Sequence, residues 1–332
     1  MANRTRPTVT VITPTYNRAD YLPETIESIL NQNYPNLELL VLDDGSDDNT
    51  RVVVQAYMEK FGNTIKYFYH DNMGEAATIN RGWPMATGDY VAIVSSDDPM
   101  LPGWLEKGIE FMEGHPEIIV GYPDWQMIDE HSRPIREIRV LEYDFAHMVA
   151  WSHCMPGPGA FIRRGAIKDI KALRDPSYRL VSDLESWLRL GLRGPFGRIP
   201  HTLATWRLHS QSVGISVKSY SRALEHVRVI DEFFAKYDMP PTITRLRRYA
   251  KSRAWYLAAV ALIPARPFRA GYYILRSLLT CPTNPPDMPY DMRRFLPRHF
   301  THFGHIMLRK MNTGNTGMSR RLAYRKKNPA KV

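Results

Sequence analysis

Alternating strand and helix signals over the first 122 residues most constrain what this chain can fold into. Short apolar runs that predict strands lie at Thr8–Thr13, Leu37–Leu42, Ile65–Tyr69, Tyr90–Val94 and Ile118–Tyr122. Helical patterns begin between them, near Leu22, Thr50, Glu75 and Pro102. Asp20 suits an N-cap, and Pro102 suits the first turn of its helix. The alternation predicts an α/β fold with a doubly wound, mainly parallel sheet.

Polar motifs follow three of these predicted strands. Pro14-Thr15-Tyr16-Asn17-Arg18 follows the first strand, Asp43-Asp44-Gly45-Ser46 the second, and Ser95-Ser96-Asp97-Asp98 the fourth. Ligands of doubly wound sheets bind beyond the carboxyl ends of the strands. We therefore expect the three motifs to share one crevice.

The adjacent acids Asp97 and Asp98 indicate a cation. Two carboxylates at the end of a buried strand repel each other, and such a pair usually persists because a cation neutralises it. Hard oxygen ligands suit Mg²⁺ or Mn²⁺. A metal at this position predicts a phosphate-bearing ligand. The alternative is helix capping, but two consecutive acids before Pro99 exceed what a cap needs.

The order and spacing of the motifs resemble the family 2 glycosyltransferases of the GT-A fold. The match continues through Asn72-Met73-Gly74 and Asn80-Arg81-Gly82 to the segments around Asp183 and His209, over about two-thirds of the chain. The resemblance implies a Rossmann-like sheet with flanking helices. It also implies transfer of one sugar from a nucleotide diphosphate sugar, with UDP the first choice and GDP and dTDP open.

The resemblance implies a metal site at the second acid of the pair. Asp98 would bind Mn²⁺ or Mg²⁺ directly, and Asp97 would hold the ribose or a metal-bound water. Ser95 departs from the fullest family pattern, which has an acid there. Arg207-Leu208-His209 resembles the family's Arg-x-His, so His209 would complete the metal site and Arg207 would face the diphosphate.

The resemblance also implies a cradle for the nucleotide base. Asp44 would accept a hydrogen bond from the base edge, and Tyr16 would lie against the base. Pro14 and Thr15 would shape the same cradle. The alternative for this region is an Asp-Gly turn with capping acids, and Asp47-Asp48 is interpreted in that way.

Asp183 matches the acid that serves as general base in relatives, with Ser182 in place of the preceding Glu. Helix capping by Asp183 remains an alternative, and Glu185 is a second candidate base. A single base implies direct displacement with inversion, because a retaining double displacement would need a nucleophile as well. The processive relatives' Gln-x-x-Arg-Trp motif is absent, so a non-processive enzyme of polysaccharide biosynthesis is expected. Its acceptor would be a glycan, lipid-linked or small-molecule hydroxyl.

Charge divides the chain near residue 215. The net charge is +10, but residues 1–215 hold 21 Lys and Arg against 28 Asp and Glu, whereas residues 216–332 hold 23 against 6. We expect a catalytic domain at 1–215, with its nucleotide-sugar side at 1–122 and its acceptor side at 123–215. A helical region at 216–315 and a disordered basic tail at 316–332 would follow.

Basic and aromatic residues on the expected C-terminal helices suit an anionic membrane surface. The alternative is packing on the catalytic domain or on a second subunit. Without a signal segment or an apolar run of about 20 residues, the expected location is the cytoplasm, with peripheral binding at the inner face of the membrane. No nucleic-acid recognition module is visible. His299, His302 and His305 are interpreted as a polar helix face rather than a metal site.

Two other function classes share parts of this pattern. A sugar nucleotidyltransferase would need a glycine-rich phosphate loop after the first strand, and Thr13–Asn17 contains no glycine. A nucleotide-sugar-binding module without turnover would keep the fold but lose catalytic acids. Asp44, Asp97, Asp98 and Asp183 are all present and favour an enzyme.

Overall fold

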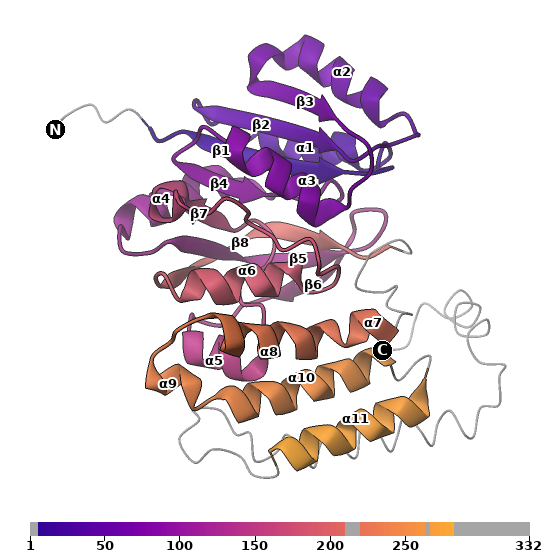
Figure 1. The fold of residues 1–332 in the computed structure, drawn as a ribbon. Helices are drawn as coiled ribbons and strands as arrows, with labels where there is room; N and C mark the ends of the chain where they lie inside the picture. Colours follow the sequence, from indigo (N-terminus) through magenta and orange to yellow (C-terminus); the bar gives the residue numbers. More distant parts are fainter. Residues whose placement is uncertain (1–5, 210–219, 263–265, 282–332) are drawn as a thin grey trace, which may run out of the picture.

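The computed structural model describes residues 6–209, 220–262 and 266–281, whose arrangement is shown in Figure 1. A mixed, mostly parallel sheet with flanking helices occupies the upper part of that view, and a layer of helices lies below it. The histidines at 299–305 and the basic tail expected at 316–332 lie outside the described residues.

The described residues form an eight-stranded sheet. Its strands are β1 (Val9–Thr15), β2 (Leu37–Asp43), β3 (Ile65–Tyr69), β4 (Tyr90–Ile93), β5 (Val120–Ile128), β6 (Pro134–Ile138), β7 (Phe161–Arg163) and β8 (Phe196–Arg207). The spatial order is β3-β2-β1-β4-β7-β5-β6, and β8 pairs with β5. The pairs β3-β2, β2-β1, β1-β4 and β5-β8 are parallel, whereas β7 and β6 pair antiparallel with their neighbours.

Helices cover both faces of the first half of the sheet. They are α1 (Leu22–Leu30), α2 (Thr50–Phe61), α3 (Glu75–Gly82) and α4 (Trp104–Gly114). Successive side chains of a strand point to opposite faces. Val9 and Val11 accordingly share a core with residues of α1, α2 and α4, whereas Ile12 shares one with Ile79 of α3. Strands β1, β2 and β4 are buried on both faces, which confirms the predicted doubly wound α/β class.

Two expectations about helix starts are wrong. Asp20 does not cap α1: Tyr21 holds the cap position, and the first amides instead donate to the backbone oxygen of Arg18. Pro102 lies outside α4, because a turn precedes that helix. Gly103 has a φ of +81°, and the amide of Trp104 donates to Leu101 O, so the Pro-Gly pair forms a β-turn.

The second half of the sheet contains a hairpin and a long parallel strand. The hairpin is the antiparallel pair β5–β6, with Trp125 opposite Ile138. Strand β8 pairs with β5 along the whole length of β5. Two helices accompany these strands, α5 (Phe145–Trp151) and α6 (Ser182–Gly191), and short 3-10 helices span Gly62–Thr64, Trp83–Met85 and Arg164–Ile167.

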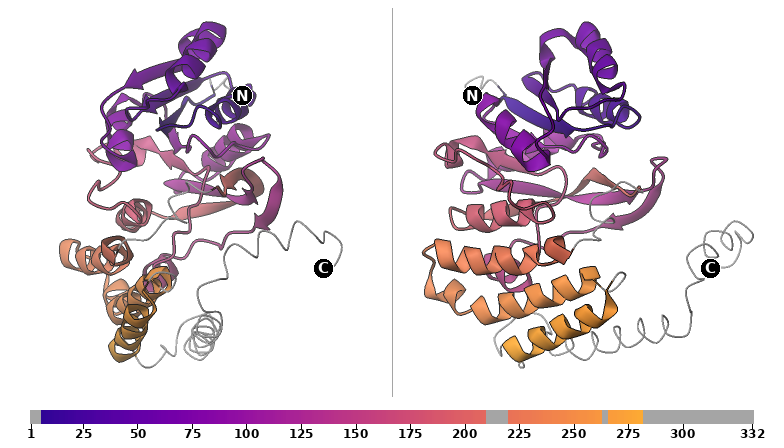
Figure 2. Two further views of the ribbon diagram at one scale, coloured as in Figure 1. Left: turned by 90° about the vertical axis from the view of Figure 1, so that its right-hand side faces the viewer. Right: turned by 45° about the vertical axis from the view of Figure 1, so that its right-hand side comes forward.

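The C-terminal helices pack on the rest of the molecule. They are α7 (Tyr220–Ala223), α8 (Glu225–Lys236), α9 (Pro241–Thr244), α10 (Arg247–Leu262) and α11 (Pro267–Thr280). α10 lies between α8 and α11, and it also contacts α5 (Figure 2). One hydrophobic cluster runs from Ile12 of the sheet through Leu188 of α6 and Ile230 of α8 to Ala258 of α10. The helical layer therefore continues the core of the sheet domain.

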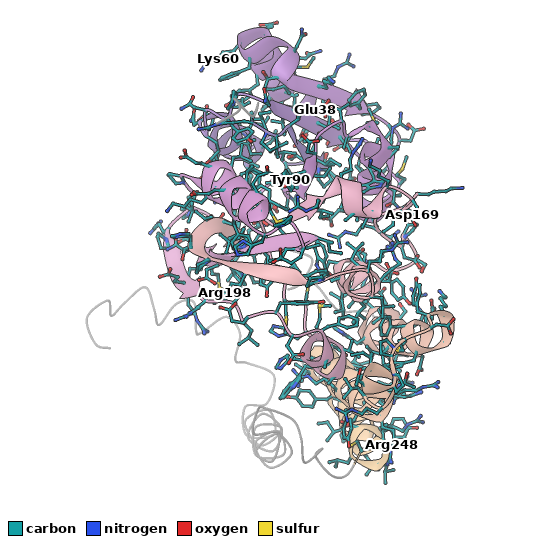
Figure 3. All side chains as sticks on the ribbon, turned by 90° about the vertical axis from the view of Figure 1, so that its left-hand side faces the viewer. Glu38, Lys60, Tyr90, Asp169, Arg198 and Arg248 are labelled. Carbon is teal, nitrogen blue, oxygen red and sulfur yellow. The ribbon has the colours of Figure 1, made fainter. Side chains whose placement is uncertain are left out.

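Apolar side chains on α8 and α11 have different surroundings. On α8, Val227, Ile230 and Phe233 are buried in the shared core. On α11, several apolar side chains are exposed, and Phe268 is 87% exposed and Leu279 72%. Figure 3 shows Arg248 of α10 at the opposite end of the molecule from Lys60 of α2.

Candidate active site

The carboxyl ends of β1, β2 and β4 meet at one edge of the sheet. Thr15 lies opposite Asp43 in the register of β1 and β2, and Ile12 lies opposite Ile93 in that of β1 and β4. The loops beyond these ends are joined by hydrogen bonds. Asn17 N donates to Ser46 Oγ over 2.9 Å, and the Arg18 Nε lies 3.4 Å from Asp97 Oδ2. The three motifs are therefore brought together as the sequence predicted.

Asp44 holds the loop that leads into α3. It is buried, its Oδ1 accepts from Met73 N at 2.6 Å, and its Oδ2 accepts from Gly74 N at 2.9 Å. The His70 Nδ1 lies 3.6 Å from Asp44 Oδ1. Each carboxylate oxygen has two lone pairs. A base edge would therefore bind to the lone pairs of Asp44 that do not accept from the loop amides. That role of Asp44 stays a prediction.

The predicted base cradle contains an accessible ring and buried polar atoms. Tyr16 is 47% exposed beside this edge of the sheet, whereas Pro14 is buried. Within the described residues, Thr15 Oγ1 and His70 Nε2 are buried without a hydrogen-bond partner. Buried polar atoms without partners are rare and call for a ligand or a water. The cradle thus offers both a stacking surface and polar atoms that could hydrogen-bond to a ligand.

Asp97 and Asp98 lie in different surroundings. Asp98 is 6% exposed, and its Oδ1 accepts from Arg207 N at 2.7 Å. Asp97 Oδ2 lies 2.8 Å from His209 Nε2. Burial raises the pKa of Asp98 well above its ordinary value, and the charge of Asp97 raises it further, against the opposing bond from Arg207. Ionising both acids after β4 is therefore unfavourable unless a positive charge joins them.

This donor set fits a hard divalent cation that binds together with substrate. No three His, Cys, Asp or Glu side chains within the described residues form a metal-binding group by themselves. Mg²⁺ is typically held by one or two carboxylates, with substrate phosphates and water completing its shell. Asp98, Asp97 and the neighbouring His209 match that pattern. The charge accumulated on the two acids is what a cation would relieve.

Arg207 fixes the loop that carries these acids. It is 1% exposed, its Nε donates to Asp97 O at 2.7 Å, and its Nη2 donates to Glu24 Oε2 at 2.6 Å. Its guanidinium also lies 5.0 Å from the Tyr21 ring centroid. The bonds described for Arg207 run to protein acceptors, so it acts first as a positioning residue. The expected contact with a diphosphate stays a prediction.

Asp183 occupies the first turn of α6, but it is not the helix cap. Val181 holds the cap position, and no side chain bonds there. Asp183 Oδ1 accepts from Leu184 N at 2.7 Å, and Oδ2 accepts from Cys154 Sγ at 3.5 Å. The capping alternative is therefore wrong, and Asp183 faces the turn-rich loop at 152–160.

Comparison with known proteins supplies the family. The family model described as "Glycosyl transferase family 2" matches residues 10–171. The Bacillus subtilis (strain 168) protein named "Putative teichuronic acid biosynthesis glycosyltransferase TuaG" is 32% identical over 215 residues, which cover 63% of this chain and 82% of that protein. The chain belongs to glycosyl transferase family 2. It is therefore a glycosyltransferase, and the nucleotidyltransferase and non-catalytic alternatives fall away.

Two solved structures share this fold. S. aureus TarS 1–349, in complex with UDP-GlcNAc, has a TM-score of 0.64 at 16% identity, covering 82% of this chain and 79% of that one. The mannosyltransferase PcManGT from Pyrobaculum calidifontis, in complex with GDP-Man and Mn²⁺, has a TM-score of 0.56 at 18% identity, covering 93% and 88%. At these identities the likeness confirms the GT-A fold, and it carries no residue assignment.

Sequence reasoning assigned no role at this family 2 site to three charged residues, Glu75, Arg174 and Arg18. Glu75 begins α3 and is exposed to solvent. Desolvation by the neighbouring protein raises the pKa of Glu75, the charges of Asp97 and Asp183 raise it further, and Arg174 and Arg18 oppose them. Asp97 and Asp183 therefore both lie within the range at which their charges act on Glu75.

Arg174 reaches this space from a loop without a motif. It is 8% exposed, and its guanidinium lies 5.3 Å from the Trp187 ring centroid. Asn80 of α3 holds the backbone of the same loop: its Nδ2 donates to Arg174 O at 2.7 Å, and its Oδ1 accepts from Arg174 N at 2.8 Å. Arg18 was visible in the first motif, but no local signal pointed to Arg174.

Glu185, the second candidate base, is engaged elsewhere. Its Oε1 accepts from Arg189 Nε at 3.0 Å, four residues further along α6. It lines a hollow between α6 and α8 together with Tyr178 and Phe233. The structure therefore favours Asp183 over Glu185 as the acid that faces the site.

Proposed function

We propose that this family 2 enzyme moves one sugar from a nucleoside diphosphate sugar to a hydroxyl acceptor, with inversion and with the help of Mn²⁺ or Mg²⁺. The observation that carries the proposal is the convergence of the loops after β1, β2 and β4, where Asp97 Oδ2 lies 3.4 Å from Arg18 Nε and 2.8 Å from His209 Nε2, beside the buried Asp98. The charges of Asp97 and Asp183 both act on Glu75. Such a set provides one group of acids for the donor's diphosphate and one acid for the acceptor.

The donor would bind at the ends of β1 and β2. Tyr16 offers its ring to the base, and Asp44, Pro14 and Thr15 form the cradle around it. TarS bound to UDP-GlcNAc and PcManGT bound to GDP-Man share the fold, which supports a nucleotide-sugar donor. The family resemblance makes a UDP-sugar the first choice.

Asp98 and His209 would hold the divalent cation, with Asp97 on the ribose or on a metal-bound water. When bound, a divalent cation polarises the phosphate oxygens and neutralises the charge of the leaving diphosphate. Arg207 keeps Asp97 and Asp98 in place through Asp97 O and the Asp98 carboxylate. The Mn²⁺ in the PcManGT complex supports this assignment at the level of the fold.

Asp183 would act as the general base. Its carboxylate takes the proton of the acceptor hydroxyl while the hydroxyl oxygen forms a bond to the anomeric carbon. The bond from that carbon to the diphosphate breaks, and its electron pair leaves with the diphosphate. Attack from the face opposite the leaving group inverts the anomeric centre. No second carboxylate is needed as a nucleophile.

Calorimetry tests the donor half of the proposal. UDP, GDP, dTDP and CDP are titrated, each with and without Mn²⁺, into the wild type and Asp98→Asn, which keeps an oxygen acceptor for Arg207 N but removes the charge. Asp169→Asn is the control, because Asp169 is an exposed acid outside the three motifs and pairs with Arg193. We expect one nucleotide to bind tightly, with metal dependence that Asp98→Asn alone abolishes. Failure of all four nucleotides to bind folded protein would overturn the proposal.

A kinetic split tests the acceptor half. With the matching sugar nucleotide, Asp183→Asn should keep donor affinity and lose transfer by about 10²-fold or more, as expected for a lost general base. The product's anomeric configuration, measured by NMR, should be opposite to that of the donor. Retention of configuration, or full activity in Asp183→Asn, would contradict the assigned mechanism.

We further propose peripheral binding of the enzyme to an anionic membrane, at the cytoplasmic face, through the outer side of α11. Four apolar side chains lie on that side, each at least half exposed: Phe268, Tyr272, Leu275 and Leu279. Arg269 and Arg276 flank them. Among the described residues no helix is long and apolar enough to cross a bilayer. Apolar side chains rimmed by arginine suit the headgroup boundary.

Vesicle sedimentation tests this membrane contact. The protein should pellet with anionic vesicles and stay in solution with neutral ones. Phe268→Ser combined with Leu279→Ser should abolish pelleting, because both apolar contacts are lost. Val52→Ser, at a 65% exposed position of α2, is the matched control and should pellet as the wild type does. Absence from both pellets would remove the proposal.

A further inference from the structure

The start of α1 and the tip of the β5–β6 hairpin meet at the guanidinium of Arg207. Glu24 lies in the first turn of α1, and Ser132 lies in the hairpin tip between β5 and β6. Glu24 Oε2 accepts from Arg207 Nη2 at 2.6 Å and from Ser132 Oγ at 2.8 Å, while Ser132 Oγ accepts from Arg207 Nη1 at 2.9 Å. The three side chains thus form a closed hydrogen-bond network. The roles proposed above use neither Glu24 nor Ser132.

The hairpin tip is held in shape by its own hydrogen bonds. Asp129 Oδ1 accepts from His131 N and from Arg133 N, each at 2.9 Å. Ser132 has a φ of +62°, and its amide donates to Asp129 O at 3.1 Å. Asp129 O also accepts from Arg207 Nη1 at 3.3 Å. The tip therefore presents two oxygens to the guanidinium from one ordered turn.

The same arginine is bonded to the two acids after β4. Its Nε donates to Asp97 O, and its backbone amide donates to Asp98 Oδ1, both at 2.7 Å. The Arg207 side chain is 1% exposed, so a displaced guanidinium has little room to find new positions. One side chain therefore joins Glu24 and Ser132 to the loop that carries the acids.

α1 also contacts the second polar residue of the Arg207-Leu208-His209 segment. Tyr21 holds the cap position of α1, and its ring centroid lies 5.0 Å from the Arg207 guanidinium carbon and 5.1 Å from the His209 ring centroid. His209 Nε2 in turn lies 2.8 Å from Asp97 Oδ2. The start of α1 thus supports two of the side chains that contact Asp97.

The carboxylate of Glu24 also contributes charge at this place. It forms an ion pair with Arg207 over 2.6 Å, and its side chain is 44% exposed. Its negative charge is one guanidinium away from Asp97 and Asp98, and it adds to the attraction that these acids exert on a cation. Removing it would raise the net charge around the acid pair by one unit, whatever else Arg207 contacts.

We propose that Glu24 is a positioning residue for the divalent cation, which holds Asp97 and Asp98 in their metal-binding orientation through Arg207 and together with Ser132. The inference rests on the proposed function, because that function assigns a cation to the two acids. The competing interpretation is a purely structural link between α1 and the hairpin. Such a link would affect stability but would leave the metal dependence of nucleotide binding unchanged.

Direct measurement of Mn²⁺ binding tests the inference. Free Mn²⁺ is followed by electron paramagnetic resonance in the full chain, saturated with whichever of UDP, GDP, dTDP and CDP binds in calorimetry. Glu24→Gln keeps the length and an acceptor oxygen but loses the charge, whereas Glu24→Asp keeps the charge but is one methylene too short. Each should weaken Mn²⁺ binding about tenfold, as is typical when a partner that orients a metal ligand is lost. Nucleotide affinity without metal should equal that of the wild type.

Glu27→Gln is the matched control. Glu27 is an exposed acid of the same helix, and it accepts a hydrogen bond from Tyr57 Oη at 2.7 Å, away from Arg207. This variant should bind Mn²⁺ as the wild type does. Urea unfolding establishes that each variant is folded at the concentrations used.

A double-mutant cycle tests whether Glu24 and Ser132 act through the same arginine. Ser132→Ala removes both hydrogen bonds of this hydroxyl and should weaken Mn²⁺ binding several-fold. Combined with Glu24→Gln, it should weaken binding by less than the product of the two single effects, because both changes release Arg207. Combined with Glu27→Gln, it should show the effect of Ser132→Ala alone.

Two results would overturn the inference. Wild-type Mn²⁺ affinity in folded Glu24→Gln and Glu24→Asp would mean that Glu24 does not position the acids. An equal loss of nucleotide affinity with and without Mn²⁺ would mean that the substitutions deform the crevice as a whole. Failure of the proposed function appears separately, as nucleotide binding by the wild type that does not depend on metal. If the wild type needs Mn²⁺ and the Glu24 variants bind it equally well, only this inference is lost.

Discussion

At the scale of single residues, two carboxylates that each lie in a loop after a strand have different roles. Asp44 and Asp98 both follow a strand of the parallel sheet and are both buried. The oxygens of Asp44 are engaged by two loop amides, so this acid organises backbone. Asp98 instead lies beside the acid Asp97. Burial and the charge of Asp97 both disfavour the ionised form of Asp98, and a bound cation would stabilise that form. Surroundings rather than residue type divide the two roles.

Gly45 offers a residue-scale prediction. Its φ is +80°, and an added Cβ would lie 2.8 Å from Asn72 N, in the loop that Asp44 holds. Gly45→Ala should therefore displace this loop, lowering stability by about 2 kcal/mol and weakening nucleotide binding about tenfold in calorimetry.

Gly103→Ala is the matched control, because Gly103 has a φ of +81° but only ordinary contacts around its Cβ position. It should lose about 1 kcal/mol of stability and keep nucleotide affinity. Equal nucleotide affinities in the two variants would show that the Gly45 collision is harmless.

His226 gives a pH prediction with a definite sign. Its pKa falls from 6.5 to about 4 in the folded protein, so the unfolded chain binds the proton more readily. The contribution of His226 is fully present above pH 6.5 and is lost as pH falls from 6.5 towards 4, by at most about 3 kcal/mol. Urea unfolding across this range should show a shallower loss for His226→Gln than for the wild type. Parallel curves would contradict the assignment.

How far sequence predicts the site also depends on the individual residue. The placement of Asp97, Asp98 and Tyr16 was predictable, because each lies in the loop after a strand, and parallel strands end at one edge of the sheet. Arg174 was not, because only the tertiary bond to Asn80 brings its loop to that edge. The burial of Arg207 was equally invisible, since its acceptors come from α1 and from two separate loops.

At the scale of elements, the strands were easier to predict than the helix boundaries. Buried strands appear as apolar runs, which local composition reveals directly. The starts of α1 and α4 depend on turns whose amides bond to backbone, so the expected roles of Asp20 and Pro102 failed. Likewise, the outward face of α11 resembles a core stripe in sequence, and only the packing on α10 distinguishes the two.

The connection between α3 and the Arg174 loop gives an element-scale prediction. Asn80→Ala removes two hydrogen bonds and leaves Arg174 N and O without those partners. Unfolding in urea should show a loss of about 1–3 kcal/mol. The transfer rate should fall more than nucleotide affinity, because the loop borders Glu75 and the acceptor side rather than the base cradle. Asn63→Ala, at an exposed position, is the control. An unchanged transfer rate in stable Asn80→Ala would contradict this role of the loop.

At the scale of the whole molecule, charge and packing divide the chain differently. The change from an acidic to a basic composition near residue 215 suggests separate domains. The hydrophobic cluster crosses that division, because it joins Ile12 of β1 to Ala258 of α10 through α6 and α8. Charge composition describes the surface and its possible binding partners, whereas the shared hydrophobic core determines which segments fold together.

This shared core predicts that the catalytic part and the helical layer unfold as one unit. Ala258 of α10 is fully buried, and Ala258→Asp should cost several kcal/mol, because an unpaired charge enters the core. Val260→Asp places the same charge on the same helix at a 42% exposed position and should cost little. Thermal unfolding is followed with and without the bound nucleotide, which reports on the sheet domain. If the two parts form a single cooperative unit, Ala258→Asp should lower the midpoint temperature of the transition that the nucleotide stabilises. Independent domains would leave that transition in place and add a second, earlier one, because the proposed nucleotide contacts belong to the sheet domain.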